Sequence, residues 1–120
     1  FSPCAMGAII NPTTIESLKC SVIAGAANNR IKKEDRDSKL LKEKKIMYVP
    51  DYVINAGGLM NVANELQGYN KEKAKFQVEG IYHILTKIFD YAINNNISTL
   101  EAANVLAERR IQDYIKWNHQ

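Results

Sequence analysis

Apolar residues follow two different patterns along the 120-residue chain. In the first half, unbroken runs of small or apolar residues lie at 21–27 and 46–49, and asparagine or proline follows each run. Continuous runs of this kind are typical of buried parallel strands. In the second half, apolar residues recur every three or four positions, which is typical of amphipathic helices. The patterns predict an α/β fold in which two or three parallel strands precede long C-terminal helices.

Three further features divide the first half. Residues 1–5 are interpreted as the end of a strand whose first residues are missing. Thr13 and Glu16 have the spacing of a capping box, which predicts a short helix to about Lys19. Residues 30–45 mix both signs of charge, so we expect a solvated surface connection in which Asp37 or Ser38 caps a short helix.

Two long helices are predicted in the second half. One apolar stripe runs over 71–94, and the three asparagines at 94–96 end it. Ser98 and Glu101 then have capping-box spacing and begin the last helix. The two stripes offer more apolar surface than so small a sheet can cover. A stripe without a cover is typical of a surface that binds a partner.

The stretch 48–66 joins the halves and carries the strongest candidate chemistry. A loop presents the amide of Asn55, and Gly57-Gly58 precedes apolar residues at helical spacing. In open α/β sheets, ligands bind where strands end and helices begin. Glycine there lets a ligand approach the backbone closely. Two plainer interpretations remain open, in which the glycines form only a tight turn and Asn55 only caps the next helix.

Composition and charge exclude several classes of function. The net charge of +3 is mild and the two signs are interspersed, so nucleic-acid binding is not indicated. Apolar runs stay well short of the roughly 18 residues of a membrane span. Cys4 and Cys20 lack metal-type spacing and suit free thiols in a reducing cytoplasm. His83 and His119 have no second ligand at metal spacing, so no metal site is predicted.

Three blocks in order carry a family resemblance: PCAMGA at 3–8, VIAGAANN at 22–29 and PDYVINAGGLMNVANELQGY at 50–69. With them, nearly the whole chain resembles the Glu/Leu/Phe/Val amino-acid dehydrogenase family, most closely the members that act on leucine. The resemblance implies that residues 1–69 form the second half of a Rossmann-type NAD-binding domain, with C-terminal helices packing on it over 70–120. It also implies NAD as cofactor and the oxidative deamination of an L-amino acid to a keto acid and ammonia.

The resemblance also implies which residues form the site. Those expected to bind the cofactor are Pro3, Cys4, Ala5, Asn28 and Asn55. Those expected to bind the substrate are Asn55, Gly57, Gly58, Leu59 and Val62. Asn28 has the alternative of an Asx-turn that ends a strand, and Leu59 and Val62 have that of ordinary core packing. Leu59 stands where the leucine enzymes typically carry valine, so a shorter pocket for valine or isoleucine is also considered.

No catalytic residue is assigned, because the chain has no G-x-G-x-x-G and no match to the family's catalytic lysine and aspartate. We therefore expect the chain alone to be inactive and an N-terminal substrate domain to complete it. The parent would be a cytoplasmic homo-oligomer. Two alternatives are a truncated, non-catalytic interaction or assembly module of the same fold and a paired system with a separate substrate-domain polypeptide.

Overall fold

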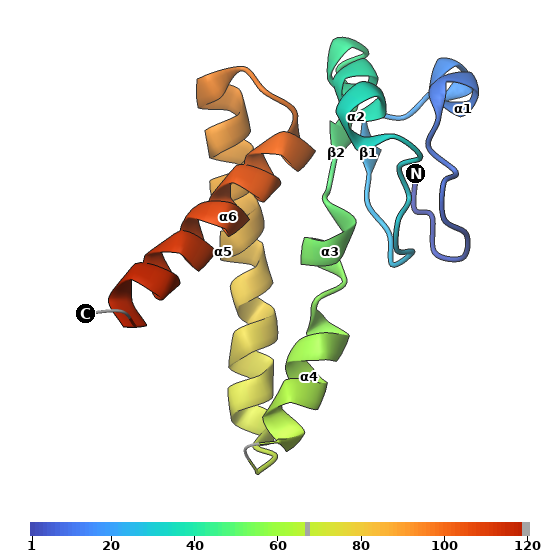
Figure 1. The fold of residues 1–120 in the computed structure, drawn as a ribbon. Coiled ribbons are helices and arrows are strands. Elements are labelled where there is room, and N and C mark those ends of the chain that lie inside the picture. Colours follow the sequence, from blue (N-terminus) through green and yellow to red (C-terminus); the bar gives the residue numbers. More distant parts are fainter. Residues whose placement is uncertain (67, 119–120) are drawn as a thin grey trace.

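The computed structural model describes residues 1–66 and 68–118. Along the chain lie α1 (Pro12–Ser17), β1 (Val22–Ile23), α2 (Glu34–Glu43), β2 (Met47–Tyr48), α3 (Asp51–Ile54), α4 (Gly57–Glu65), α5 (Lys71–Asn95) and α6 (Thr99–Asn118). The strands, α1 and α2 form one part of the molecule, and α4 to α6 extend away from it as a helical arm, with α3 between them (Figure 1). The radius of gyration is 15.9 Å, larger than the roughly 13.6 Å expected for a compact domain of this length.

The predicted parallel pairing is confirmed, although the strands are shorter than the apolar runs. β1 and β2 lie in parallel with Val22 opposite Met47 and Ile23 opposite Tyr48. The Phe1 amino group donates to the Val22 carbonyl oxygen at 2.9 Å, and the Ala24 N–H donates to the Phe1 carbonyl oxygen at 3.0 Å. The first residues therefore run beside β1 on the side away from β2.

Gly25 explains how the first segment lies so close to β1. A Cβ atom added at Gly25 would lie 2.2 Å from the Pro3 carbonyl oxygen. The Ala27 N–H donates to the same oxygen at 3.1 Å. Only glycine leaves room for this backbone approach.

Helix α1 forms where it was predicted, but the predicted capping pair is wrong. The Asn11 side chain accepts from the Thr14 N–H at 3.2 Å, and the Thr14 hydroxyl oxygen accepts from the Asn11 N–H at 3.0 Å. These two bonds form a capping box of Asn11 and Thr14 in place of the expected one of Thr13 and Glu16. An asparagine followed by Pro12 explains why α1 begins earlier than predicted.

Residues 30–45 were predicted to be a solvated connection, and this prediction is wrong for one face of the helix that forms there. Helix α2 occupies most of it, and Asp37, Ser38 and Leu41 are buried. Asp37 and Ser38 lie inside α2 and do not begin it, yet the Asp37 carboxylate accepts from the Lys33 N–H at 3.0 Å and so caps the helix from its first turn. Arg30, just before α2, is also buried. The mixed charges correctly predicted the exposed face of α2, but they gave no indication of its buried face.

The predicted glycine turn is also wrong. Gly57 and Gly58 are the first two residues of α4, and neither has a positive φ. Ala56 is the N-cap of α4 and makes no side-chain cap bond, while Asn55 ends α3. The interpretation of Asn55 as a cap for α4 is therefore also wrong, and its side chain is available for other contacts.

The two long helices form as the periodicity predicted, and they pack on each other through small residues. Ser98 accepts from the Glu101 N–H at 3.1 Å at the start of α6, as predicted. Val53 of α3 and four residues of the long helices form one buried cluster, which consists of Val53, Ile88, Ala92, Ala102 and Ala103. Some larger apolar side chains pack half-buried against this cluster, whereas others are exposed, such as Phe76 on α5 at 77%. Within the described ranges, none of these helices has the length and apolar composition needed to cross a bilayer.

Candidate functional site

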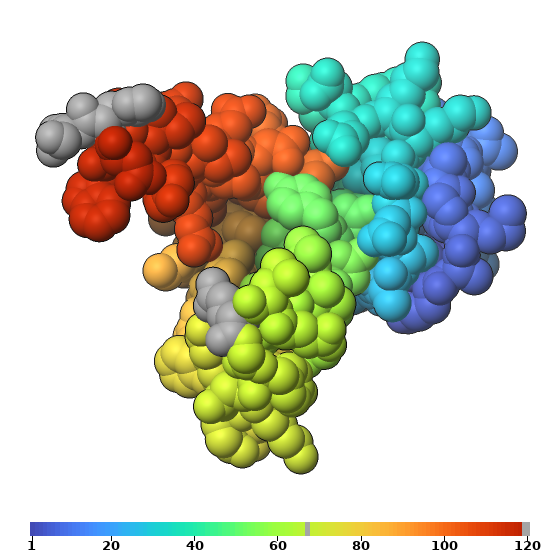
Figure 2. Space-filling view, turned by 60° about the horizontal axis from the view of Figure 1, so that its bottom comes forward, coloured from blue at the N-terminus to red at the C-terminus, as the bar shows by residue number. Residues whose placement is uncertain are grey.

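The side chains of Asn28 and Asn55 meet beyond the carboxyl ends of the two parallel strands. Asn28 follows β1, and Asn55 follows β2 after the single turn of α3. The Asn55 Nδ2 group donates to Asn28 Oδ1. Figure 2 shows the green α3 segment beside the light-blue segment that follows β1. Residues 27 positions apart in sequence therefore form one polar unit at the strand ends.

An open pocket of about 530 Å³ surrounds this amide pair. It is lined by Ala26, Asn28, Tyr52, Asn55, Ala56 and Leu59. Within the part of the chain that the structure describes, Asn28 Nδ2 and Asn55 Oδ1 have no other hydrogen-bond partner. The pocket therefore offers one free amide donor and one free amide acceptor to a ligand.

The predicted substrate residues are placed on α4 in different surroundings. Leu59 lies at the pocket and is 76% exposed. Val62, one turn later, is also exposed, outside the residues that line the pocket. Both residues were alternatively interpreted as core packing, and their exposure contradicts that interpretation. A Cβ added at Gly58 would meet no atom within 4 Å, whereas one at Gly57 would contact Val78.

Pro3 is buried and Cys4 exposed, and both contact the backbone of residues 25–27, while Ala5 is exposed. The Cys4 thiol is exposed, and its Sγ atom lies 3.5 Å from the Ser2 hydroxyl. A hydrogen bond from the backbone of Ala26, aided by Ser2, lowers the pKa of Cys4 below its ordinary value. Ala26 itself lines the pocket, so Cys4 contacts the pocket wall from outside.

Tyr52 is a pocket residue that sequence reasoning missed. It lies on α3 three residues before Asn55, which places both on one helical face. Its hydroxyl donates to Asn104 Oδ1 on α6 at 2.8 Å. Burial, with Glu34 and Asp51 nearby, raises the pKa of Tyr52 to about 12. The helical spacing of Tyr52 and Asn55 was the available signal, but a loop had been predicted there.

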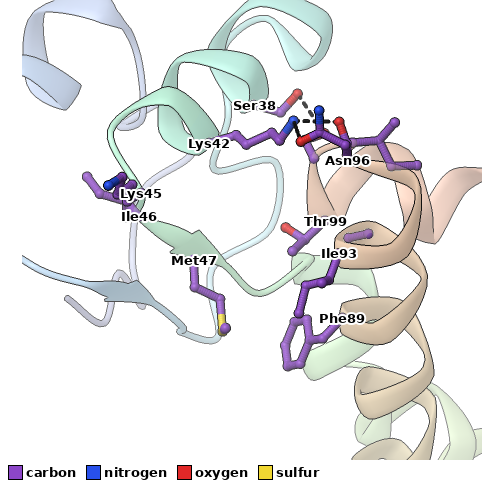
Figure 3. Close-up of a pocket in the computed structure, with 12 residues that line it drawn as sticks. Ser38, Lys42, Lys45, Ile46, Met47, Phe89, Ile93, Asn96 and Thr99 are labelled. Carbon is purple, nitrogen blue, oxygen red and sulfur yellow. Dashed lines mark hydrogen bonds between the residues drawn. The ribbon is translucent and has the colours of Figure 1, made fainter.

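Two other hollows lack such an amide pair. One, of about 370 Å³, lies where β2 faces the C-terminal ends of α2 and α5 (Figure 3). Met47 and Phe89 line it, and Lys42 Nζ donates to Asn96 Oδ1 at 2.8 Å across its top. The other, of about 740 Å³, is a mostly apolar groove between α3, α5 and α6. Among the described residues, no group of three acidic, histidine or cysteine side chains could hold a metal ion.

Comparison with known proteins identifies the family. The model of the Glutamate/Leucine/Phenylalanine/Valine dehydrogenase family matches residues 1–117. Leucine dehydrogenase from Thermoactinomyces intermedius is 57% identical over 112 residues, which cover 93% of this chain and 30% of that protein. L-tryptophan dehydrogenase from Nostoc punctiforme is 53% identical over 113 residues, which cover 94% of this chain and 32% of that protein.

The crystal structure of L-tryptophan dehydrogenase from Nostoc punctiforme has the same fold over this region. It superposes with a TM-score of 0.91 at 51% identity, over 97% of this chain and 34% of that one. The chain therefore belongs to the Glu/Leu/Phe/Val dehydrogenase family, and the resemblance carried by the three sequence blocks is confirmed. It spans about a third of the length of the curated relatives it matches.

Proposed function

We propose that this chain is the cofactor-facing part of an NAD-dependent dehydrogenase that deaminates a branched-chain L-amino acid to its keto acid and ammonia. Residues 1–69 then form the second half of a Rossmann-type domain, and residues 70–120 pack on it. The observation that carries the proposal is the hydrogen bond between Asn55 and Asn28 at the ends of two parallel strands. Such strand ends are where ligands bind in open α/β sheets.

The pocket residues fit the nicotinamide end of a dinucleotide. Asn28 Nδ2 can donate to a ligand oxygen, and Asn55 Oδ1 can accept from a ligand N–H or hydroxyl group. A carboxamide and a ribose hydroxyl both offer these complementary groups. When bound, the nicotinamide supplies a hydride acceptor for the substrate Cα. The chain's own contribution is to hold this end of the cofactor in one orientation.

The exposed face of α4 suits an aliphatic substrate. Leu59 lines the pocket beside the amide pair, and Val62, one helical turn later, presents a second exposed apolar side chain. Gly58 leaves the adjoining backbone open to approach. One methylene changes the preference by only about 1–3 kcal/mol. The proposal therefore includes leucine, valine and isoleucine as substrates.

A chimera tests this proposal. This chain replaces the matched 112-residue segment of the Thermoactinomyces intermedius leucine dehydrogenase, and the unaltered enzyme is the positive control. We expect NAD reduction with leucine, valine or isoleucine, and a loss of roughly 100-fold in kcat/KM for Asn55→Ala, because misplaced reactants react slowly. A chimera that folds but reduces NAD with none of the three, or in which Asn55→Ala keeps full activity, contradicts the proposal.

The second candidate is a non-catalytic interaction or assembly module of the same fold. It is favoured by the apolar residues exposed on the helical arm, among them Leu66 and Phe76. In the dehydrogenase, a substrate domain on the same or a separate polypeptide would cover them. In the module, copies of the chain would cover one another. Sedimentation of the isolated chain tests the module. Stable dimers, together with an inactive chimera, would favour the module over the dehydrogenase.

A further inference from the structure

Arg30 is fully buried, two residues after Asn28, although its charge had placed it in a solvated connection. Its Nη2 group donates to the Val49 carbonyl oxygen at 2.7 Å. Its guanidinium lies over the ring of Tyr48, 5.0 Å from the ring centre. One arginine side chain therefore contacts both the last residue of β2 and the residue that follows it.

The backbone of Arg30 makes a second contact with the same region. Its N–H donates to Asp51 Oδ2 at 3.4 Å, at the start of α3. Asp51 Oδ1 accepts from the Tyr52 N–H at 2.9 Å, so the carboxylate also holds the first turn of α3. Asn55 is the residue that ends this helix. The segment that follows β1 and the segment that follows β2 are thus joined at Arg30 and again at Asn28.

Burying the Arg30 side chain costs free energy, because its charged guanidinium is removed from water. Two of its donors, Nε and Nη1, have no hydrogen-bond partner among the residues that the structure describes, and the face of Tyr48 compensates only part of the lost hydration. An apolar residue of similar volume would pack there without that cost. An apolar residue could not make the directed hydrogen bond to the Val49 carbonyl oxygen, which requires a long side chain with a donor at its end.

We propose that Arg30 is a positioning residue that clamps the turn after β2 to the end of β1, and so keeps Asn55 within hydrogen-bond reach of Asn28. As a role in cofactor binding this rests on the proposed function. The clamp itself exists without a cofactor and can be measured without one. An inactive chimera would therefore contradict the proposed function without contradicting the clamp. An unchanged Asn28–Asn55 contact in an Arg30 variant would contradict the clamp without contradicting the proposed function.

Nuclear magnetic resonance of the 120-residue chain tests the clamp. The readout is the Overhauser contact between the side-chain amide protons of Asn55 and the side chain of Asn28. Arg30→Met keeps the volume and removes the donor, whereas Arg30→Lys keeps a charged donor one atom shorter. Arg110→Met on the exposed face of α6 is the matched control.

We expect Arg30→Met to lose most of the Asn28–Asn55 contact while its Tm stays equal to or above that of the unchanged chain. Arg30→Lys should restore part of the contact, and Arg110→Met should leave it unchanged. A purely structural role predicts the reverse order, with a lower Tm and an intact contact. Full contact in Arg30→Met overturns the proposal, and so does unfolding of both Arg30 variants.

Discussion

The strand half and the helical arm bury their apolar residues to different extents. In the strand half, which consists of the two strands with α1 and α2, large side chains form a buried cluster that Leu100 of α6 completes: Ile10, Ile15, Ile23, Ile31, Leu41, Ile46, Tyr48 and Leu100. In the helical arm, the buried cluster contains three alanines, and large residues such as Leu66 and Phe76 face outward. Figure 2 shows α4 standing out from the rest of the surface.

This difference separates two tasks. The strand half has a core of large side chains and can therefore fix polar groups such as Asn28 and Arg30 in defined positions. The buried cluster of the helical arm contains three alanines, and large side chains such as Leu66 and Phe76 stay exposed and free to pack elsewhere. The site lies where the two parts meet, because α3 and α4 connect them. Substitutions in the two parts should therefore have different consequences.

The largest expected effect compares a buried with an exposed apolar side chain. Ile23→Ala removes a side chain that is fully buried between β1 and α2, and should lower the free energy of unfolding by about 2–5 kcal/mol. Phe76→Ala on α5 should change it by less than about 0.5 kcal/mol. Urea unfolding of both variants gives the two values. Equal losses would mean that the exposed face is covered within this chain.

The next effect uses two glycines in different surroundings. Gly25→Ala drives a methyl group into the Pro3 backbone and should cost about 1–3 kcal/mol, with loss of the pairing between the first residues and β1. Gly58→Ala meets nothing and lies in a helix, so it should stabilise the chain by up to about 1 kcal/mol. Amide exchange at Ala24 and Ala27 reports the pairing directly. Unchanged exchange in Gly25→Ala would contradict the close approach.

A pH dependence follows from the buried ring of Tyr48. Burial raises its pKa to about 12 in the folded chain, from an ordinary value of 10.0. Because the folded pKa is the higher one, this contribution to stability is complete below pH 10 and is lost as the pH rises through 12. The loss should be about 2 kcal/mol. Tyr48→Phe keeps the ring under Arg30 and should remove this part of the alkaline loss, as measured by urea unfolding across that range.

The smallest effect concerns reactivity. The Ala26 backbone and the Ser2 hydroxyl lower the pKa of Cys4, so its thiolate forms at a lower pH in the folded chain than in the unfolded one. In a Cys20→Ser background, alkylation by iodoacetamide should therefore reach half its maximal rate at a lower pH when the chain is folded. Ser2→Ala should move that pH upward. Identical profiles in folded and urea-unfolded chain would contradict this account.

Features with a regular repeat or a local cap were predictable from the sequence. The limits of α5 and the start of α6 followed from helical spacing and Ser98, and the parallel strands followed from two apolar runs. Asn28 was expected at a strand end and Asn55 in the loop after the next strand, and the structure brings the two side chains together. Local patterns suffice where neighbours in sequence decide the conformation.

Features that depend on distant contacts were not predictable in this way. The burial of Arg30 arises from the ring of Tyr48 and from the carbonyl of Val49, which lies 19 residues away, and an arginine in a charged run gives no sign of them. Gly57 and Gly58 are helical in a segment that packs against α5, and a tertiary contact of this kind overrides the turn preference of glycine. Tyr52 entered the site because α3 replaced the predicted loop.

The most direct test of the site is a double-mutant cycle on Asn28 and Asn55 in the active chimera. The measured quantity is kcat/KM for NAD in Asn28→Ala, Asn55→Ala and the double variant. If the two amides hold the cofactor as one unit, each single substitution costs a large part of the activity, and the double variant loses little more than the worse single one. Single variants with unchanged kcat/KM, or strictly multiplicative losses, would contradict the claim that this pair forms the cofactor site.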